Sequence, residues 1–300
     1  MANSLDSSNF LDREHAVEVR QRPGRARGEQ ATLLRWSDLP GVELLRADFR
    51  NHAFVPHWHD GFMIATSARG AERVRHHHVE HVVGPGSLAL LNPGELHDGE
   101  AYDPATGWDF RALYISADAL FDRQQTSDAP HGLHFAQPVC MAETTWSFFL
   151  HTHRALESST SQLERQCLLS TLSEHMLRQT FGFRPRRGGT LAASRSALDT
   201  VREYLDARWV SPVSLDELAA VAGLSRYHLL RSFRMRFGLP PHAYQNQLRV
   251  RHAKELLFQG AAITKAALES GFYDQAHLTN VLRRHTGVTP ARLQQQELCA

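Results

Sequence analysis

The last third of the chain contains an internal repeat, and this repeat restricts the possible fold more than any other feature of the sequence. The stretch LDELAAVAGLS, which begins at Leu215, matches ITKAALESGFY, which begins at Ile263, with small and apolar residues at equivalent positions. The spacing between equivalent residues is 48 at first and becomes 49 farther along, where Gly238 corresponds to Gly287. Two copies in step over more than 20 positions predict two supersecondary units of the same kind.

Each copy has the pattern of a helix-turn-helix unit. A short apolar helix carries an alanine where a second helix must pack closely, and a glycine follows that suits the positive φ of a tight turn. An N-cap residue, Ser225 in the first copy and Asp274 in the second, then begins the next helix. We therefore predict helix-turn-helix units at about 214–237 and about 263–286.

The second helix of the first unit, SRYHLLRSFRMRFG, is expected to have a strongly basic exposed face. Residues 195–300 contain 14 Lys and Arg against 9 Asp and Glu, whereas residues 1–194 have a net charge of −4. A helix that reads DNA needs side chains for base edges near its N-terminus and cations for phosphates around them. Two purely structural helical hairpins are the alternative, and they would leave this basic face without a role.

The same region resembles the C-terminal domain of AraC/XylS-type transcriptional regulators. The matching motifs are AGLSRYHLLRSFRMRFGLPPHAY, the connecting LRVRHAKELL, and SGFYDQAHL with GVTP, which together span about residues 197–295. The resemblance implies two units joined by a long helix, with recognition helices in major-groove segments about one helical turn apart. Carried over by position, the DNA-binding candidates are Arg226, Tyr227, Leu230, Arg231 and Arg234 in the first unit, and Gln275, Ala276, Asn280, Arg283 and Arg284 in the second.

The second unit departs from the pattern of that family. The family usually has aromatic residues where this chain has Leu278, Leu282 and Thr286, and commonly has arginine where this chain has Asn280. We therefore expect the second unit to read DNA sequence more weakly than the first.

The region from Val42 to about Ile115 has a different pattern. Its short β-like segments are LLRADFR, FMIATSA, ERVRHHHVEHVV, SLALLNP and FRALYIS, separated by Gly and Pro turns. Such a pattern predicts a small barrel or sandwich. Over about residues 35–120 it resembles the cupin-like sensor domain of the same regulators. The expected fold class is α+β and multidomain: an N-terminal cupin-like β-barrel with a helical pair, then an all-α C-terminal tandem helix-turn-helix.

Three histidines in the β region, His57, His59 and His97, have the spacing of the ligands in metal-binding cupins. Those proteins also use a glutamate, but Met63 and Ile64 occupy the stretch where it should lie. Three interpretations remain open: a sensor pocket without metal, a metal-bound sensor, and histidines with a structural role.

The first interpretation is the one we adopt as the expectation. It places Trp58 and Glu95 beside the three histidines in an effector pocket and assigns no catalytic residue, no metal and no cofactor. The neighbouring run His76–His78 is expected to be a solvated hairpin turn.

Two amphipathic stretches at about 143–181 are predicted to be helices. Their apolar stripes are Trp146, Phe149 and Leu150, then Leu163, Cys167, Leu168, Leu172 and Met176. Packing against the barrel explains part of these stripes, and the resemblance suggests that the helices also mediate dimerisation. The sensor is therefore assigned to residues 31–181, preceded by a disordered tail at 1–30 and followed by a linker at 182–194 and the DNA-binding domain at 195–300.

These features predict a cytoplasmic, ligand-responsive transcription regulator that acts as an activator. The expected partners are double-stranded promoter DNA, RNA polymerase, an unidentified small-molecule effector and a second copy of the chain, with no membrane. The alternatives are a cupin-type metalloenzyme with an accessory helical domain and a regulator that needs no ligand.

Overall fold

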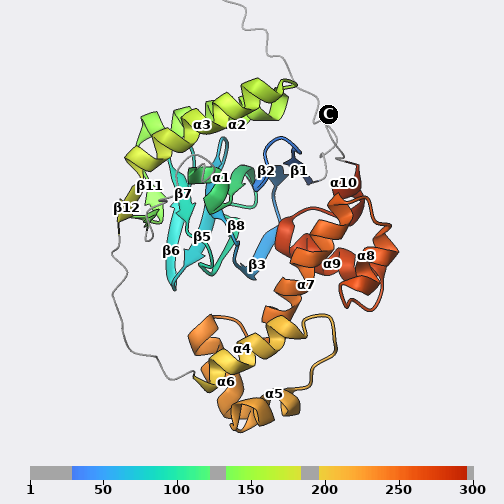
Figure 1. Ribbon diagram of the computed structural model, residues 1–300. Helices are drawn as coiled ribbons and strands as arrows, with labels where there is room; N and C mark the ends of the chain where they lie inside the picture. Colours follow the sequence, from blue (N-terminus) through green and yellow to red (C-terminus); the bar gives the residue numbers. More distant parts are fainter. Residues whose placement is uncertain (1–28, 122–132, 184–195, 296–300) are drawn as a thin grey trace, which may run out of the picture.

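The computed structural model describes residues 29–121, 133–183 and 196–295, and its N-terminal part is built on two antiparallel sheets that face each other (Figure 1). The larger sheet has the order β1 (Gln30–Arg35), β2 (Val42–Phe49), β9 (Trp108–Ile115), β4 (Phe62–Ser67), β7 (Leu88–Leu91), β11 (Val139–Cys140). The smaller sheet has the order β3 (Ala53–His57), β8 (His97–Ala101), β5 (Glu72–His76), β6 (Val79–Val83). A separate pair, β10 (Leu133–Phe135) and β12 (Phe181–Phe183), and the short α1 (Ala117–Phe121) complete this part.

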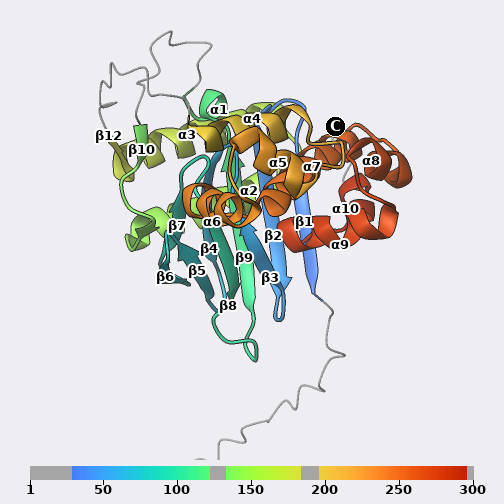
Figure 2. The ribbon, with the colours of Figure 1, turned by 90° about the horizontal axis from the view of Figure 1, so that it is seen from below.

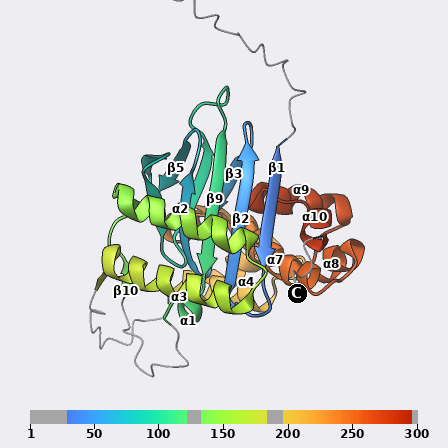
Figure 3. The same ribbon diagram turned by 90° about the horizontal axis from the view of Figure 1, so that it is seen from above.

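The central strand β4 shows why this part is stable. All six of its side chains are buried, which is unusual for an antiparallel strand because one face is commonly exposed to water. Met63 and Ala65 face the space between the sheets, whereas Phe62 and Ile64 pack beneath two helices. Those helices, α2 (Glu143–Ser158) and α3 (Gln162–Gln179), run across the outer face of the larger sheet (Figure 3).

The expected apolar stripe of α3 is wrong in part. Leu163 is 71% exposed and Cys167 is also exposed, while Arg165 is buried. The guanidinium of Arg165 donates to both carboxylate oxygens of Asp38 at 2.9 Å, so a long-range ion pair makes a charged residue part of the buried face. A search for apolar periodicity cannot detect such a residue.

The expected turn between β5 and β6 is present, because His77 and His78 have positive φ values of 48° and 66°. The first residue of the run is not solvated, however. His76 is buried, and its Nε2 lies 3.2 Å from Oε2 of Glu95.

The C-terminal part is entirely helical where the structure describes it, which confirms the predicted fold class (Figure 2). Its elements are α4 (Ala197–Ala207), α5 (Leu215–Ala222), α6 (Arg226–Phe237), α7 (Pro241–Phe258), α8 (Ile263–Glu269), α9 (Gln275–Thr286) and α10 (Pro290–Gln294). The long helix α7 joins the two repeats: Tyr244 and Leu248 pack with α5 and α6, whereas Val250, Ala253 and Leu257 pack with α8 and α9.

Two predicted boundaries need correction. Gln30 belongs to β1 rather than to a tail, and Gly182 pairs with His134 between β12 and β10 rather than starting a linker. Residues 1–28 and 184–195, on which the rest of those two predictions falls, lie outside the described residues. Among the described residues, none of the helices has both the length and the apolar character needed to cross a membrane.

The barrel and the second helix-turn-helix unit share one continuous apolar cluster, which runs from the space between the sheets to α7, α8 and α9. Helix α9 packs along β3, and the ring of Phe49 lies directly against Gly287, so that a Cβ at Gly287 would overlap it. No motif in the sequence predicts this contact between the two parts of the chain.

Candidate functional site

Local hydrogen bonds hold the first helix-turn-helix unit in its shape. The Ser214 side chain accepts from the backbone N–H of Glu217 and the Glu217 side chain accepts from that of Ser214, so a capping box begins α5. Gly223 ends α5 with φ of 63°, and the Ser225 side chain caps α6 by accepting from the N–H of His228. These contacts satisfy the free amides at the start of each helix and set the turn between them.

The five candidate residues of α6 are all exposed, with Tyr227 at 67%. Leu229 and Phe233 on the opposite side of α6 are fully buried. Arg226 forms an ion pair with Asp216 on α5, whereas Arg231 and Arg234 form no ion pair within the described residues. Two arginine side chains on this helix are therefore available to an anionic partner.

The second unit repeats the glycine turn and the cap of the second helix, whereas its first helix, α8, begins without a side-chain cap. Gly271 has φ of 73°, and the Asp274 side chain caps α9 by accepting from the N–H of His277. The five candidate residues of α9, namely Gln275, Ala276, Asn280, Arg283 and Arg284, are exposed.

One of these candidates faces the barrel. The Arg283 guanidinium lies 3.4 Å from Oε2 of Glu29, whose other oxygen accepts from three consecutive backbone amides at residues 50–52. Glu29 is thus fixed by the barrel, and Arg283 connects α9 to it.

A cavity of about 420 Å³ lies between the mouth of the barrel and α7. Strands β1, β2 and β9 and the loop after β3 line one side, and α7 with the end of α9 lines the other. Its wall includes His57, Trp58, His59 and Tyr114 from the barrel, and Gln247, Arg251, Lys254 and Glu255 from α7. A molecule in this cavity would touch both the barrel and the helix that joins the two repeats.

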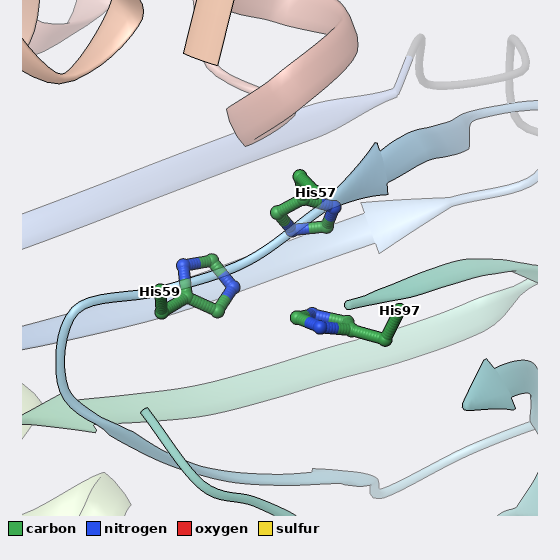
Figure 4. A group of neighbouring side chains, drawn as sticks. All are labelled: His57, His59 and His97. Atoms are coloured by element: carbon green, nitrogen blue, oxygen red, sulfur yellow. The ribbon is translucent and has the colours of Figure 1, made fainter. Parts of the chain in front are cut away.

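The three histidines predicted from their spacing do come together (Figure 4). His57 ends β3 and His97 begins β8 directly opposite it, and His59 follows in the loop after β3. The ring centroid of His57 lies 4.4 Å from that of His97 and 4.7 Å from that of His59. Of the three, His57 and His59 line the cavity and His97 does not.

The environment keeps the three rings neutral at neutral pH. Burial lowers the pKa of His57 and His59 well below the usual value, and it lowers the pKa of His97 to about 4. Nδ1 of His57 lies 2.8 Å from the carbonyl oxygen of Val55, and Nδ1 of His97 lies 3.0 Å from that of Glu95. A neutral imidazole that donates from Nδ1 has its lone pair on Nε2, so these two rings can accept a hydrogen bond or bind a metal.

The structure does not bring Glu95 to the cavity wall, which corrects its assignment to the effector pocket. Its carboxylate accepts from the backbone N–H of Asn92 at 2.9 Å and from Asn92 Nδ2 at 3.1 Å. Burial opposes ionisation, but these bonds and His76 outweigh it and lower the Glu95 pKa to about 2. Glu95 therefore stabilises the turn before β8.

Trp58 lies at the boundary between the two parts of the chain. Its ring centroid is 5.0 Å from that of Tyr244 on α7, and its carbonyl oxygen accepts from Nε2 of Gln247 at 2.7 Å. Trp58 thus lines the cavity and also contacts the helical region.

Ion pairs join the charged residues in the cavity wall, and three of the four cross the boundary between the barrel and α7. Arg35 lies 2.6 Å from Glu43 and 2.8 Å from Glu255, Lys254 lies 2.8 Å from Glu43, and Arg251 lies 3.0 Å from Asp60. Burial opposes the ionisation of Glu43, but Lys254 and Arg35 outweigh it and lower its pKa.

Sequence reasoning missed the residues of α7 among these. Their only signal was the alternation of charged and apolar residues in RVRHAKELL, which also fits a solvated helix face.

Comparisons with known proteins agree with this arrangement. Residues 39–173 match the family described as the AraC-like ligand binding domain, and residues 218–296 match a helix-turn-helix domain family. The chain is 29% identical over 233 residues to the HTH-type transcriptional regulator YbfI of Bacillus subtilis, covering 75% of this chain and 81% of that protein.

Two solved structures are also similar. An AraC family transcriptional regulator from Rhodopseudomonas palustris is 32% identical, and the match covers 33% of this chain and 95% of that chain with a TM-score of 0.32. The fold of unsaturated fatty acid-bound ToxT from Vibrio cholerae matches 89% of this chain and 95% of that chain, with 13% identity and a TM-score of 0.50.

Proposed function

This chain belongs to the AraC family of transcriptional regulators, and from that premise we propose that it activates transcription from specific promoters in response to a small-molecule effector. DNA binding is assigned to residues 195–300 and effector binding to residues 30–183, bounds that include β1 and β12. We further infer that the protein works in the cytoplasm, contacts RNA polymerase and has no catalytic activity.

The observation that carries this proposal is the form of the two repeats. In each repeat a capped second helix buries its apolar side and exposes all the residues that match the family's DNA-reading positions. Tyr227, Leu230 and Arg231 near the start of α6, and Gln275, Ala276 and Asn280 of α9, are the proposed base-reading residues. Arg234 and Arg284 are proposed to bind phosphates, and Arg226 and Arg283 do so only if they leave Asp216 and Glu29.

The cavity between the barrel and α7 is the proposed effector site. Its cations and carboxylates are already paired, so a ligand would meet mainly the neutral His57, His59 and Tyr114 and the indole of Trp58. These groups suit a small molecule that is largely uncharged and has aromatic and hydrogen-bonding parts. Because α7 joins the two helix-turn-helix units, a ligand there favours one arrangement of the units over others.

Self-association is proposed to use α2 and α3. Leu163 and Cys167 on α3 are exposed and do not pack in the core. Apolar side chains that are exposed on one face of a helix commonly mark a surface for another protein.

The test of DNA recognition is capture of genomic fragments by the purified full-length protein, followed by sequencing. We expect the captured fragments to share a site with two halves about one helical turn apart, and the variant with Tyr227→Ala and Arg231→Ala to lose this enrichment. Both substitutions are at exposed positions and should not affect folding. Fragments without a common sequence would contradict the proposal.

The effector site is tested separately with a reporter gene behind a captured promoter, screened against a library of small molecules. His57→Ala should abolish the response to an active compound and leave promoter binding in the absence of compound unchanged. An unchanged response in this variant would exclude the cavity as the effector site.

A further inference from the structure

We propose that His57, His59 and His97 bind a divalent metal ion of the zinc type, with an open coordination position that faces the cavity between the barrel and α7. The proposal adds a metal ion to the proposed effector site. It rests on the proposed function only where it assigns the open coordination position to contact with the effector. The binding of the ion itself depends on the three side chains alone.

The distances between the three side chains fit this role. One ring nitrogen of each histidine lies within 4.8 Å of the others. Zinc–nitrogen bonds of about 2.0–2.1 Å in a tetrahedral site place the nitrogens about 3.3 Å apart. Small rotations of the rings, each of roughly 1 Å at the nitrogen, would therefore close the site around an ion without moving the strands.

The groups around the histidines also prepare them as ligands. The carbonyl oxygens of Val55 and Glu95 accept hydrogen bonds from Nδ1 of His57 and His97, which leaves the Nε2 lone pair of each ring available to an ion. Metal-bound histidines commonly have such a partner on the second ring nitrogen. Nε2 of His59 is buried and has no hydrogen-bond partner among the described residues, so it lacks the partner that a buried polar atom normally has.

The composition of the site indicates which ion it would hold. Three neutral imidazoles suit zinc, copper, iron or nickel, whereas calcium and magnesium prefer oxygen ligands. Met63 and Ile64 of β4 provide no carboxylate, so three protein ligands leave one tetrahedral position free. Because His57 and His59 line the cavity, water or a donor atom of the effector can occupy that position.

A second group, His76, His77 and Glu95, provides a matched comparison within the same chain. His77 is 68% exposed, and the Glu95 carboxylate is already bound to Asn92 and His76. One member of this group is exposed and the group's carboxylate is held by Asn92, so His77→Ala serves as the control variant.

The test uses the full-length protein, stripped with a chelator and titrated with Co²⁺, with Zn²⁺ as the competitor. We expect about one Co²⁺ per chain, visible absorption bands typical of four-coordinate cobalt, and displacement by Zn²⁺. His59→Ala and His97→Ala should each weaken binding more than about 100-fold, which exceeds the usual effect of changing an outer partner. His77→Ala should bind as the unchanged protein does.

Folding is checked by the unfolding temperature in the presence of chelator, which should be similar for the unchanged protein, His59→Ala, His97→Ala and His77→Ala. Addition of Zn²⁺ should raise the unfolding temperature of the unchanged protein and of His77→Ala only. His59→Gln, which keeps a polar side chain, replaces any alanine variant that does not fold. Absence of stoichiometric Co²⁺ binding by the unchanged protein overturns the inference, as does a loss of binding in His77→Ala. Either result would leave promoter capture intact, so failure of the metal site is distinguishable from failure of the proposed function.

Discussion

Arg231 and Arg284 are both exposed arginines on the second helices of the repeats, but their positions predict different roles. Arg231 lies in the first half of α6, where side chains reach base edges, and arginine commonly binds guanine through two hydrogen bonds. Arg231→Ala should cost about 1–3 kcal/mol of specific binding and relax the preference at one base pair. Fluorescence anisotropy with the captured site and its single-base variants measures both effects.

Arg284 lies in the last turn of α9, where a phosphate contact is expected. Arg284→Ala should lower affinity for all DNA sequences alike and reduce the slope of log affinity against log salt by about one. If Arg231→Ala behaved in this way too, α6 would not read bases through that residue.

The buried Glu72 carboxyl predicts how the stability of the protein depends on pH. It is 5% exposed on the inner side of β5, and burial raises its pKa to about 8. Between pH 4.5 and about 8 the folded protein keeps a proton that the unfolded chain has released, so its free energy of unfolding falls as pH rises. The slope is up to about 1.4 kcal/mol per pH unit.

Glu72→Gln has almost the same volume and cannot ionise. Compared with the unchanged protein, the variant should therefore lose less stability between about pH 5 and about pH 8. Scanning calorimetry at the two pH values measures the difference, and parallel pH profiles for the two proteins would show that Glu72 ionises freely.

At the scale of elements, the two turns between the helices of the repeats have the same backbone conformation in different surroundings. Gly223 and Gly271 both have positive φ, so alanine at either position should cost about 1–2 kcal/mol in strain. A Cβ at Gly223 would meet open space, whereas one at Gly271 would overlap the carbonyl oxygen of Val210. Gly271→Ala should therefore lose about 1–3 kcal/mol more than Gly223→Ala in denaturant unfolding. Equal losses of stability in the two variants would mean that the backbone around Val210 moves away from the new Cβ without a cost in free energy.

The repeats could be predicted because the features that define them are local. A capping box, an N-cap residue and a glycine in the left-handed conformation act within four or five residues, so each leaves a direct trace in the sequence. The strands β1, β3 and β8 were not predicted. Pro56 interrupts β3, and β8 has the sequence HDGEA, so the pairing of these strands with distant partners, rather than their own composition, makes them strands.

The histidines of the candidate site could be predicted, because their spacing follows a known pattern. His57 and His97 are 40 residues apart in the sequence, but their spacing resembled a known arrangement and the structure places them opposite each other. Glu95 was assigned to the pocket because it is near His97 in sequence, yet its bonds to Asn92 hold it in the turn. The residues of α7 in the cavity wall could not be found, because they reach it through a contact between the two parts of the chain.

At the scale of the whole molecule, the contact between the barrel and the helical part of the chain has two components. An apolar cluster continues from the barrel into the second repeat, and ion pairs surround the cavity beside it. The first repeat has its own cluster, to which Trp58 of the barrel contributes, and Leu96 of the barrel lies against Gly238 at the end of α6. Effector binding at the cavity should thus act on the second repeat through the shared apolar cluster, and on the first through Trp58 and α7 (Figure 1).

The strength of this contact can be measured by introducing a site for a sequence-specific protease between residues 183 and 196. The apolar cluster and the ion pairs predict that the two pieces stay together in gel filtration after cleavage. Glu43→Gln should weaken their association by about 2–5 kcal/mol, because the buried Glu43 carboxylate is the shared partner of Arg35 and Lys254. Glu157→Gln is the matched control, since Glu157 forms ion pairs only with Arg46 and Arg111 of the barrel among the described residues. Pieces of the unchanged protein that separate after cleavage would show that the connecting segment, rather than the contact, holds the barrel on the second repeat.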